Sequence, residues 1–187
     1  MSGRNRVRIV GGEWRSRLVR FPATPGLRPT PDRVRETLFN WLGQRLDGLA
    51  CVDLFAGSGA LGFEALSRGA ARVVMVERDR EALDALRAAV LELDARGAQV
   101  VAGDALGWLA RGQDRFDVAF VDPPYASDLA ARALQALPAR LNPGARVYVE
   151  SARPLEAGTP WRMLREGKAG AVRFALYEFN QPENPPQ

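Results

Sequence analysis

The stretch Val118-Ala119-Phe120-Val121-Asp122-Pro123-Pro124-Tyr125 joins four apolar residues to an acid, two prolines and an aromatic ring. Four consecutive apolar residues indicate a strand buried on both faces, as the strands of a parallel sheet are. The prolines end such a strand because they have no N–H to donate, and Asp122, directly before Pro123, is held extended. We therefore predict a carboxylate and proline-locked carbonyls at the carboxyl end of a central strand, a place that suits the NH2 group of a planar ring.

Strand-type and helix-type segments alternate on both sides of this stretch. The predicted strands are residues 51–55, 72–77, 99–102, 116–121 and 145–151, and the predicted helices are residues 60–68, 79–94, 105–110 and 129–137. Such alternation is typical of a doubly wound α/β domain with a mostly parallel sheet. Two later segments, 161–166 and 171–179, are expected to form an antiparallel hairpin at the C-terminal edge of the sheet.

The first 35 residues are strongly basic. Nine arginines stand there against Glu13 and Asp32, a net charge of +7, whereas the whole chain carries +4 and the remaining residues therefore carry −3. Two strand-like runs around a Gly11-Gly12 turn predict a basic N-terminal β-hairpin with arginines on one face. A basic segment on a mildly acidic body favours nucleic acid as the partner. The predicted RNA-binding residues are Arg4, Arg6, Arg8, Arg15, Arg17, Arg20, Arg28 and Arg33.

A helix is predicted to begin at Thr30-Pro31-Asp32, with Thr30 as the N-cap, and to close near Gly48. The expected organisation is an arginine-rich segment at 1–29, a catalytic domain at 30–179 and a disordered tail at 180–187. Whether Thr30, Arg33 and Arg35 face a cofactor or RNA is left open by the sequence.

The composition excludes several classes of active site. The chain has no histidine and one cysteine, which removes Ser-His and Cys-His catalysis and an internal disulfide framework, and no metal is expected. No run of about 18 apolar residues predicts a membrane span, and the N-terminus lacks the apolar core of a signal peptide. The single cysteine fits a reducing cytoplasm, so a cytoplasmic protein is expected. The expected oligomeric state is a monomer.

A glycine-rich loop, Gly57-Ser58-Gly59-Ala60-Leu61-Gly62, follows the first strand of the alternating region and opens a helix, as in dinucleotide-binding proteins. Glu77 ends the next strand, where an acid would hold a ribose diol; this pattern alone fits both NAD and S-adenosylmethionine. Two further acids favour S-adenosylmethionine, because Asp53 suits a cationic amino-acid group and Asp104 suits an adenine amine while capping a helix. The predicted cofactor contacts are Asp53, Phe55, Gly57, Ser58, Gly59, Glu77, Arg78, Asp104 and Ala105.

These motifs together resemble the ribosomal small-subunit methyltransferase D family of class I, Rossmann-like methyltransferases. The matching stretches are residues 8–15, 26–42, 53–62, 76–77, 103–105 and 116–125, with 148–150 beyond. The resemblance implies S-adenosylmethionine as methyl donor and the exocyclic N2 amine of a guanine in 16S rRNA as acceptor. It also implies an assembled or assembling small subunit as the substrate.

The predicted catalytic residues are Asp122, Pro123, Pro124 and Tyr125. Asp122 and the Pro123 carbonyl would accept the two N–H groups of the amine, and Tyr125 would stack on a base taken out of its helix. Asp-Pro-Pro-Tyr alone also fits an adenine-N6 methyltransferase acting on DNA or RNA. A non-catalytic RNA-binding assembly factor is the alternative from another class, and an NAD oxidoreductase is the weakest.

Overall fold

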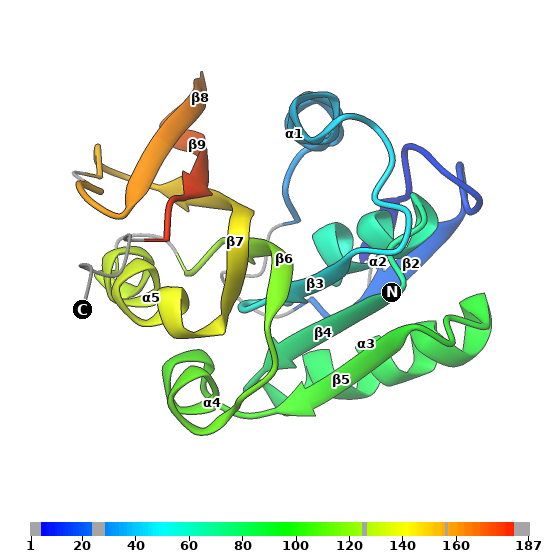
Figure 1. The fold of residues 1–187 in the computed structure, drawn as a ribbon. Helices are drawn as coiled ribbons and strands as arrows, with labels where there is room; N and C mark the ends of the chain where they lie inside the picture. Colours follow the sequence, from blue (N-terminus) through cyan, green and yellow to red (C-terminus); the bar gives the residue numbers. More distant parts are fainter. Residues whose placement is uncertain (1–4, 24–28, 125–126, 156, 182–187) are drawn as a thin grey trace.

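A seven-stranded sheet forms the centre of the protein in the computed structural model, which describes residues 5–23, 29–124, 127–155 and 157–181 (Figure 1). The strand order is β5-β4-β3-β6-β7-β9-β8. Neighbouring strands from β5 to β7 are parallel, and β9 and β8 continue the sheet with antiparallel pairing. The strands are β3 (Ala50–Asp53), β4 (Arg72–Glu77), β5 (Ala98–Ala102), β6 (Phe116–Val121), β7 (Leu141–Ser151), β8 (Trp161–Ala169) and β9 (Val172–Phe179).

Helices cover both faces of the sheet, as a doubly wound fold requires. On one face lie α1 (Asp32–Leu42), α2 (Ala60–Ser67) and α3 (Arg80–Leu93), and on the other lie α4 (Ala105–Arg111), α5 (Leu129–Ala136) and a 3-10 helix (Leu137–Arg140). The central strand β6 is buried from both sides, since Phe120 belongs to the core under α1 to α3 and Val121 to the core under α4 and α5. The predicted fold class is confirmed, and the bounds of β4 and β6 are those predicted.

The N-terminal hairpin consists of β1 (Asn5–Arg8) and β2 (Leu18–Phe21), paired antiparallel. Its buried residues, among them Val7 and Val19, join the core that also contains α1 to α3. The prediction of a tight turn at Gly11-Gly12 is wrong, because nine residues connect the two strands and these glycines lie near the start of the connection. They are needed for a close approach instead: a Cβ on Gly12 would lie 1.9 Å from the carbonyl oxygen of Ser67 in α2.

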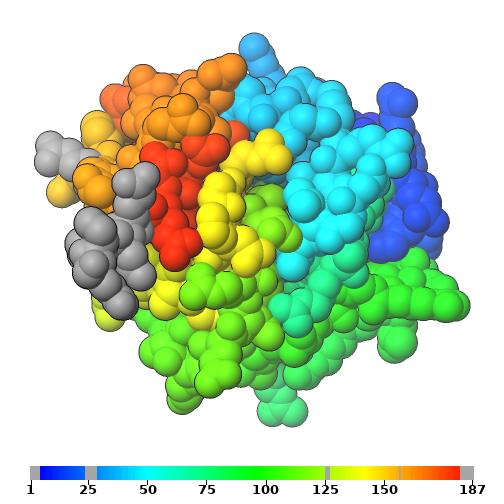
Figure 2. Space-filling model, in the orientation of Figure 1, coloured from blue at the N-terminus to red at the C-terminus, as the bar shows by residue number. Residues whose placement is uncertain are grey.

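The start and the end of α1 differ from the prediction. Pro31, not Thr30, occupies the N-cap position, and no side chain caps the helix. The helix ends at Leu42, where Gly43 adopts a left-handed conformation, so that Leu46 reaches the core from the following loop. Figure 2 shows α1 in cyan between the dark blue hairpin and the orange and red C-terminal strands. Among the described residues, no helix is long and apolar enough to cross a membrane.

Candidate active site

Asp122 stands where the sequence predicts it, directly after β6 at the carboxyl end of the sheet. Pro123 beside it is partly exposed and Pro124 is exposed, so the site opens to solvent on this side. Tyr125 lies outside the described residues. The strand neighbours of β6 are β3 and β7, and both run parallel to it. Polar groups at the ends of these strands therefore meet Asp122 at one edge of the sheet.

The first partner of Asp122 comes from the segment before α1. The hydroxyl of Thr30, which is 5% exposed, lies 3.1 Å from Oδ2 of Asp122. Burial raises the pKa of Asp122 well above its ordinary value, and the charge of Glu150 raises that pKa further, whereas the Thr30 hydroxyl lowers it. The sequence left open whether Thr30 faces a cofactor or RNA. The structure places its hydroxyl against Asp122, the predicted catalytic acid.

The glycine-rich loop connects β3 to α2. Two acids, Glu77 and Asp53, accept hydrogen bonds from the backbone N–H groups of its glycines. Gly59 has φ of +75°, and a Cβ there would lie 2.4 Å from the Phe63 ring, so only glycine fits. Glu77, at the end of β4, accepts hydrogen bonds of 2.8 Å from the backbone N–H groups of Gly57, Arg78 and Asp79. Its carboxylate is thereby fixed beside the loop, as the predicted ribose contact requires.

Asp53, the last residue of β3, has an unsatisfied buried oxygen. Its Oδ2 accepts from the N–H of Gly62 at 3.1 Å, but its Oδ1 has no hydrogen-bond partner among the described residues. Burial raises the pKa of Asp53 to about 7, and the charge of Glu77 adds to that rise. A buried acceptor without a donor is costly. A ligand that brings a positively charged N–H group would satisfy Oδ1 and favour the charged form, which is the fit expected for the amino-acid part of S-adenosylmethionine.

Asp104 follows β5 and is the N-cap of α4, since its Oδ2 accepts from the N–H of Gly107 at 2.7 Å. The capping role predicted for it is therefore confirmed, and its exposed position leaves the other oxygen open to a ligand. The strands β5, β4, β3 and β6 are neighbours in that order. Their carboxyl ends consequently present one row of acids, which are Asp104, Glu77, Asp53 and Asp122.

The other predicted cofactor residues lie in the segments that carry this row. Gly57, Ser58 and Gly59 are buried, and Phe55 is partly exposed. Arg78 is exposed directly after Glu77, and Ala105 is buried at the start of α4. The structure thus brings the predicted cofactor residues to the same edge of the sheet as Asp122.

The predicted RNA-binding arginines are exposed wherever the structure describes them. Arg6, Arg8 and Arg20 lie on the exposed face of the hairpin, and Arg6 pairs with Arg20 across it. Arg15 and Arg17 lie in the connection between the strands, and Arg33 is exposed on α1. Arg4 and Arg28 lie outside the described residues.

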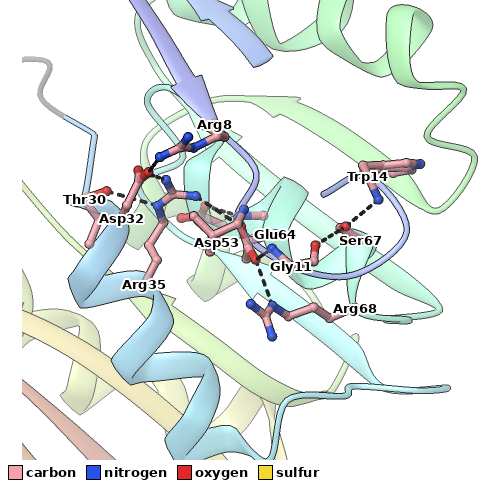
Figure 3. Close-up of polar contacts among 12 residues, drawn as sticks. Arg8, Gly11, Trp14, Thr30, Asp32, Arg35, Asp53, Glu64, Ser67 and Arg68 are labelled. Carbon is pink, nitrogen blue, oxygen red and sulfur yellow. Dashed lines mark hydrogen bonds and ion pairs between the residues drawn. The ribbon is translucent and has the colours of Figure 1, made fainter. Parts of the chain in front are cut away.

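A buried ion-pair network ties the hairpin to the site (Figure 3). Glu64 of α2, which is fully buried, accepts from the Arg35 guanidinium at 3.1 Å and from Arg68 at 2.8 Å. It also accepts from the backbone N–H groups of Val10 and Gly11 in the hairpin connection, at 2.9 and 2.8 Å. Arg35 therefore faces neither cofactor nor RNA, and all of these charges are paired.

Arg35 also connects this network to Asp122. Its Nε donates to the Thr30 carbonyl at 3.1 Å and its Nη2 donates to Asp32 at 2.6 Å, while Arg8 of the hairpin donates to the other oxygen of Asp32 at 2.9 Å. Figure 3 shows the contacts of Arg8, Asp32, Arg35 and Thr30. Because the Thr30 hydroxyl also contacts Asp122, polar contacts lead from an exposed arginine of the hairpin to the predicted catalytic acid.

Comparison with known proteins agrees with this geometry. A family model described as "Conserved hypothetical protein 95" matches residues 7–178. The Ribosomal RNA small subunit methyltransferase D of Escherichia coli K12 is 44% identical over 184 residues, which cover 95% of this chain and 92% of the relative. The chain belongs to the methyltransferase D family. The protein of the same name from Haemophilus influenzae is 40% identical over 185 residues, covering 95% of this chain and 96% of the relative.

A solved structure extends the agreement to the fold. The "Putative methyltransferase yhhF from Escherichia coli" superposes with a TM-score of 0.85 at 42% identity, covering 94% of this chain and 99% of that one. As a member of the methyltransferase D family, the chain is a methyltransferase, and the resemblance predicted from the sequence is confirmed. The NAD oxidoreductase alternative is thereby excluded.

Sequence reasoning made Thr30 a helix cap and left open whether it faces a cofactor or RNA, so its contact with Asp122 was not predicted. It gave no role to Glu150 or Tyr148 of β7, which are joined by a 2.8 Å hydrogen bond from the Tyr148 hydroxyl. A signal was present for Glu150, because an acid at the end of an otherwise apolar strand is unusual in a core. The contact of Thr30 with Asp122 spans 92 positions in the chain, and no local pattern reports it.

Proposed function

We propose that this methyltransferase transfers a methyl group from S-adenosylmethionine to the exocyclic N2 amine of a guanine in 16S rRNA of the small ribosomal subunit, acting as a monomer. The observation that carries the proposal is Asp122-Pro123-Pro124 at the carboxyl end of β6, in line with the acids that end β3, β4 and β5. The names of relatives that are 44% and 40% identical support rRNA of the small subunit as the substrate.

Asp122 and the Pro123 carbonyl would receive the two N–H groups of the target amine. An aromatic amine is a poor nucleophile because its lone pair is delocalised into the ring, and two acceptors localise that lone pair and aim it. The contribution of these residues is therefore mainly positioning. Tyr125 would stack on the extruded base and offset part of the cost of unstacking, by about 1–3 kcal/mol.

Three acids would each bind a different part of S-adenosylmethionine. Asp53, with its unsatisfied Oδ1, would hold the cationic amino-acid end, Glu77 the ribose diol and Asp104 the adenine amine. Bound there, S-adenosylmethionine supplies an electrophilic methyl group. The remaining contacts would line the same loop and strand ends, from Phe55, Gly57, Ser58, Gly59, Arg78 and Ala105.

The basic N-terminal segment, residues 1–29, together with Arg33 would bind the phosphate backbone of the RNA. Such contacts supply affinity that depends on salt but carry no sequence information. The choice of nucleotide would therefore come from the active-site pocket and from the distance between that pocket and the hairpin.

The direct test uses small ribosomal subunits from a strain that lacks this protein. They are incubated with the protein and labelled S-adenosylmethionine, the rRNA is digested, and the labelled nucleoside is identified. N2-methylguanosine is the expected product. Label in N6-methyladenosine would establish the adenine-N6 alternative instead, and absence of label would refute the small subunit as the substrate.

The role of Asp122 is tested in the same assay. Asp122→Ala should abolish transfer while the affinity for the cofactor stays within a few-fold of the unsubstituted protein. Asp128→Ala is the matched control, because Asp128 is an exposed acid six positions later in the chain, and its ion pair with Arg132 is a long one of 3.7 Å. An equal loss of cofactor affinity and transfer in Asp122→Ala would make Asp122 a binding residue and refute the assigned role.

A further inference from the structure

The C-terminal hairpin of β8 and β9 has its tip at the same edge of the sheet as Asp122. Strand β9 runs antiparallel to β7, and its second residue, Arg173, pairs with Ser151 at the carboxyl end of β7. Strand β8 runs antiparallel to β9, and Lys168 near its end pairs with Arg173. Neighbouring strands lie about 5 Å apart, so the backbones of β9 and β8 lie about 10 and 15 Å from that of β6. The tip of the C-terminal hairpin therefore lies beside the active site.

The two ends of the C-terminal hairpin differ in how their charges are paired. At the end away from the active site, Arg162 of β8 lies opposite Glu178 of β9, and the two form an ion pair. At the active-site end, Lys168 lies opposite Arg173, and both residues are exposed. Opposite charges that face each other across two strands stabilise a sheet, whereas like charges destabilise it. The pairing at the tip is thus unfavourable for the protein alone and favours an anion from outside the chain.

The charges near the tip add up to a positive patch. Neither Lys168 nor Arg173 forms an ion pair with an acid of the described residues. Arg153 is exposed two residues after Ser151, whose hydroxyl donates to the Arg153 carbonyl at 2.8 Å. The acid on the same face of β8 is Glu166, so three cations stand against one acid, a net charge of +2. The sheet edge thus presents acids at the ends of β5, β4, β3 and β6 and cations at β9 and β8.

The tip of the C-terminal hairpin is packed against α1. Phe174, the third residue of β9, is buried, and its ring lies 5.4 Å from that of Trp41 in α1 and 6.3 Å from that of Tyr148 in β7. Gly167 of β8 allows this packing, because a Cβ there would lie 2.5 Å from the Phe174 ring. The cations of the tip therefore keep a fixed place beside the active site.

The two basic hairpins lie on opposite sides of Asp122. Strand β2 of the N-terminal hairpin contacts α3, which packs on β4 and β5, whereas β8 is the edge strand at the other end of the sheet. Figure 1 shows β6 between β2 and the C-terminal strands, and Figure 2 shows α1 between the same two parts. A polyanion in contact with both hairpins would pass over the carboxyl end of β6, where Asp122 lies.

We propose that the tip of the C-terminal hairpin, with Lys168 and Arg173, is a second phosphate-binding surface for the substrate RNA, so that the strand carrying the target base is held on both sides of Asp122. The inference deepens the proposed function and rests on it. Contacts of this kind add affinity and fix the register of a strand without reading its sequence. A strand held on both sides keeps its backbone in place while the target base is taken out of its stack.

The test is a charge reversal that the hairpin itself tolerates. Lys168→Glu places an acid opposite Arg173, a pairing that stabilises a sheet, so the melting temperature should not fall although the cations of the tip are neutralised. Affinity is measured at several salt concentrations for two probes, protein-free 16S rRNA and small subunits from a strain that lacks this protein. The slope of log affinity against log salt should fall by about two units, and the affinity at about 100 mM salt by about tenfold or more.

The matched control is Arg162→Ala, which removes a cation of the same hairpin at the end away from the active site. Its slope and its affinity should stay within about twofold of those of the unsubstituted protein, as should the affinity of both variants for S-adenosylmethionine. Where Lys168→Glu lowers the melting temperature, Arg173→Gln is judged by the same criteria, with an expected fall of about one unit of slope.

An unchanged slope in Lys168→Glu overturns the inference, and if Arg6→Ala still lowers the slope, the proposed function stands without it. An equal loss in Arg162→Ala also overturns it, because the loss would then reflect the charge of the whole chain. A loss for small subunits but not for protein-free rRNA would mean that the tip contacts a ribosomal protein, which overturns it as well. If the unsubstituted protein binds neither probe, the proposed function fails together with the inference.

Discussion

The affinity for the cofactor should depend on pH through Asp53. This carboxyl is fully buried, its Oδ1 lacks a hydrogen-bond partner among the described residues, and burial raises its pKa to about 7. If the amino-acid end of S-adenosylmethionine binds at Asp53 as proposed, binding favours the ionised carboxyl. The protein then releases a proton when it binds the ligand, and a proton competes with the ligand below the pKa.

The size of the effect follows from that pKa. A carboxyl with a pKa of about 7 is ionised to roughly 9% at pH 6 and to roughly 91% at pH 8. The apparent Kd for S-adenosylmethionine, or for its demethylated product, should therefore be about tenfold weaker at pH 6 than at pH 8, which is about 1.4 kcal/mol. Asp53→Asn should bind more weakly at pH 8 and lose this pH dependence.

Isothermal titration calorimetry measures both consequences. Repeating the titration at pH 6 in two buffers that differ in ionisation enthalpy should show nearly one proton released per ligand bound, falling toward zero at pH 8. A Kd that is flat between pH 6 and 8 in the unsubstituted protein would refute the reasoning. So would an Asp53→Asn variant with the same tenfold change, because the titrating group would then be another one.

Three further predictions concern stability and RNA binding. Glu64→Gln leaves buried arginines with a weakened partner and should lower the free energy of unfolding by about 3–5 kcal/mol in urea, whereas Asp47→Asn, in an exposed pair, should change it by less than about 1 kcal/mol. Gly59→Ala, at φ +75° and against Phe63, should lower the melting temperature and weaken cofactor binding together, unlike a substitution that affects binding alone. Arg6→Ala and Arg20→Ala should each reduce the salt dependence of RNA affinity by about one unit of slope, and an unchanged slope would remove the hairpin from the RNA interface.

The sheet and the order of the acids were predictable because local patterns encode them. The apolar runs that became β4 and β6 have the predicted bounds, and a residue that directly follows a parallel strand lies at the carboxyl edge wherever the strand is placed. Glu77 and Asp122 could therefore be assigned to one site although 45 positions separate their numbers in the sequence.

The wrong predictions for Thr30 and for Gly11-Gly12 share a physical cause, since each concerns a residue whose contact partner is distant in the chain. Thr30 has the residue type and the neighbours of an N-cap, but its hydroxyl contacts Asp122. Gly11 and Gly12 have the composition of a turn, but they allow the connection to pack against Ser67. For Arg35, one of nine arginines in the first 35 residues, the sequence left open whether it faces a cofactor or RNA, and it faces neither. It is fully buried because Glu64, 29 positions later, pairs with it.

The same buried contacts bear on how a target nucleotide is chosen. Phosphate contacts carry no sequence information. Exposed arginines on a flexible arm would therefore not select a particular target nucleotide. Here the hairpin connection is held to α2 through the backbone contacts of Val10 and Gly11 with Glu64, and Arg8 is joined to the segment of Thr30 through Asp32. The position of the exposed arginines relative to Asp122 is therefore constrained by hydrogen bonds to the buried Glu64 and by the exposed Arg8–Asp32 ion pair. If the N-terminal hairpin binds phosphates as proposed, its position relative to Asp122 limits which RNAs can react. Only an RNA fold whose target base lies at the matching distance from the bound phosphates can place its amine against Asp122.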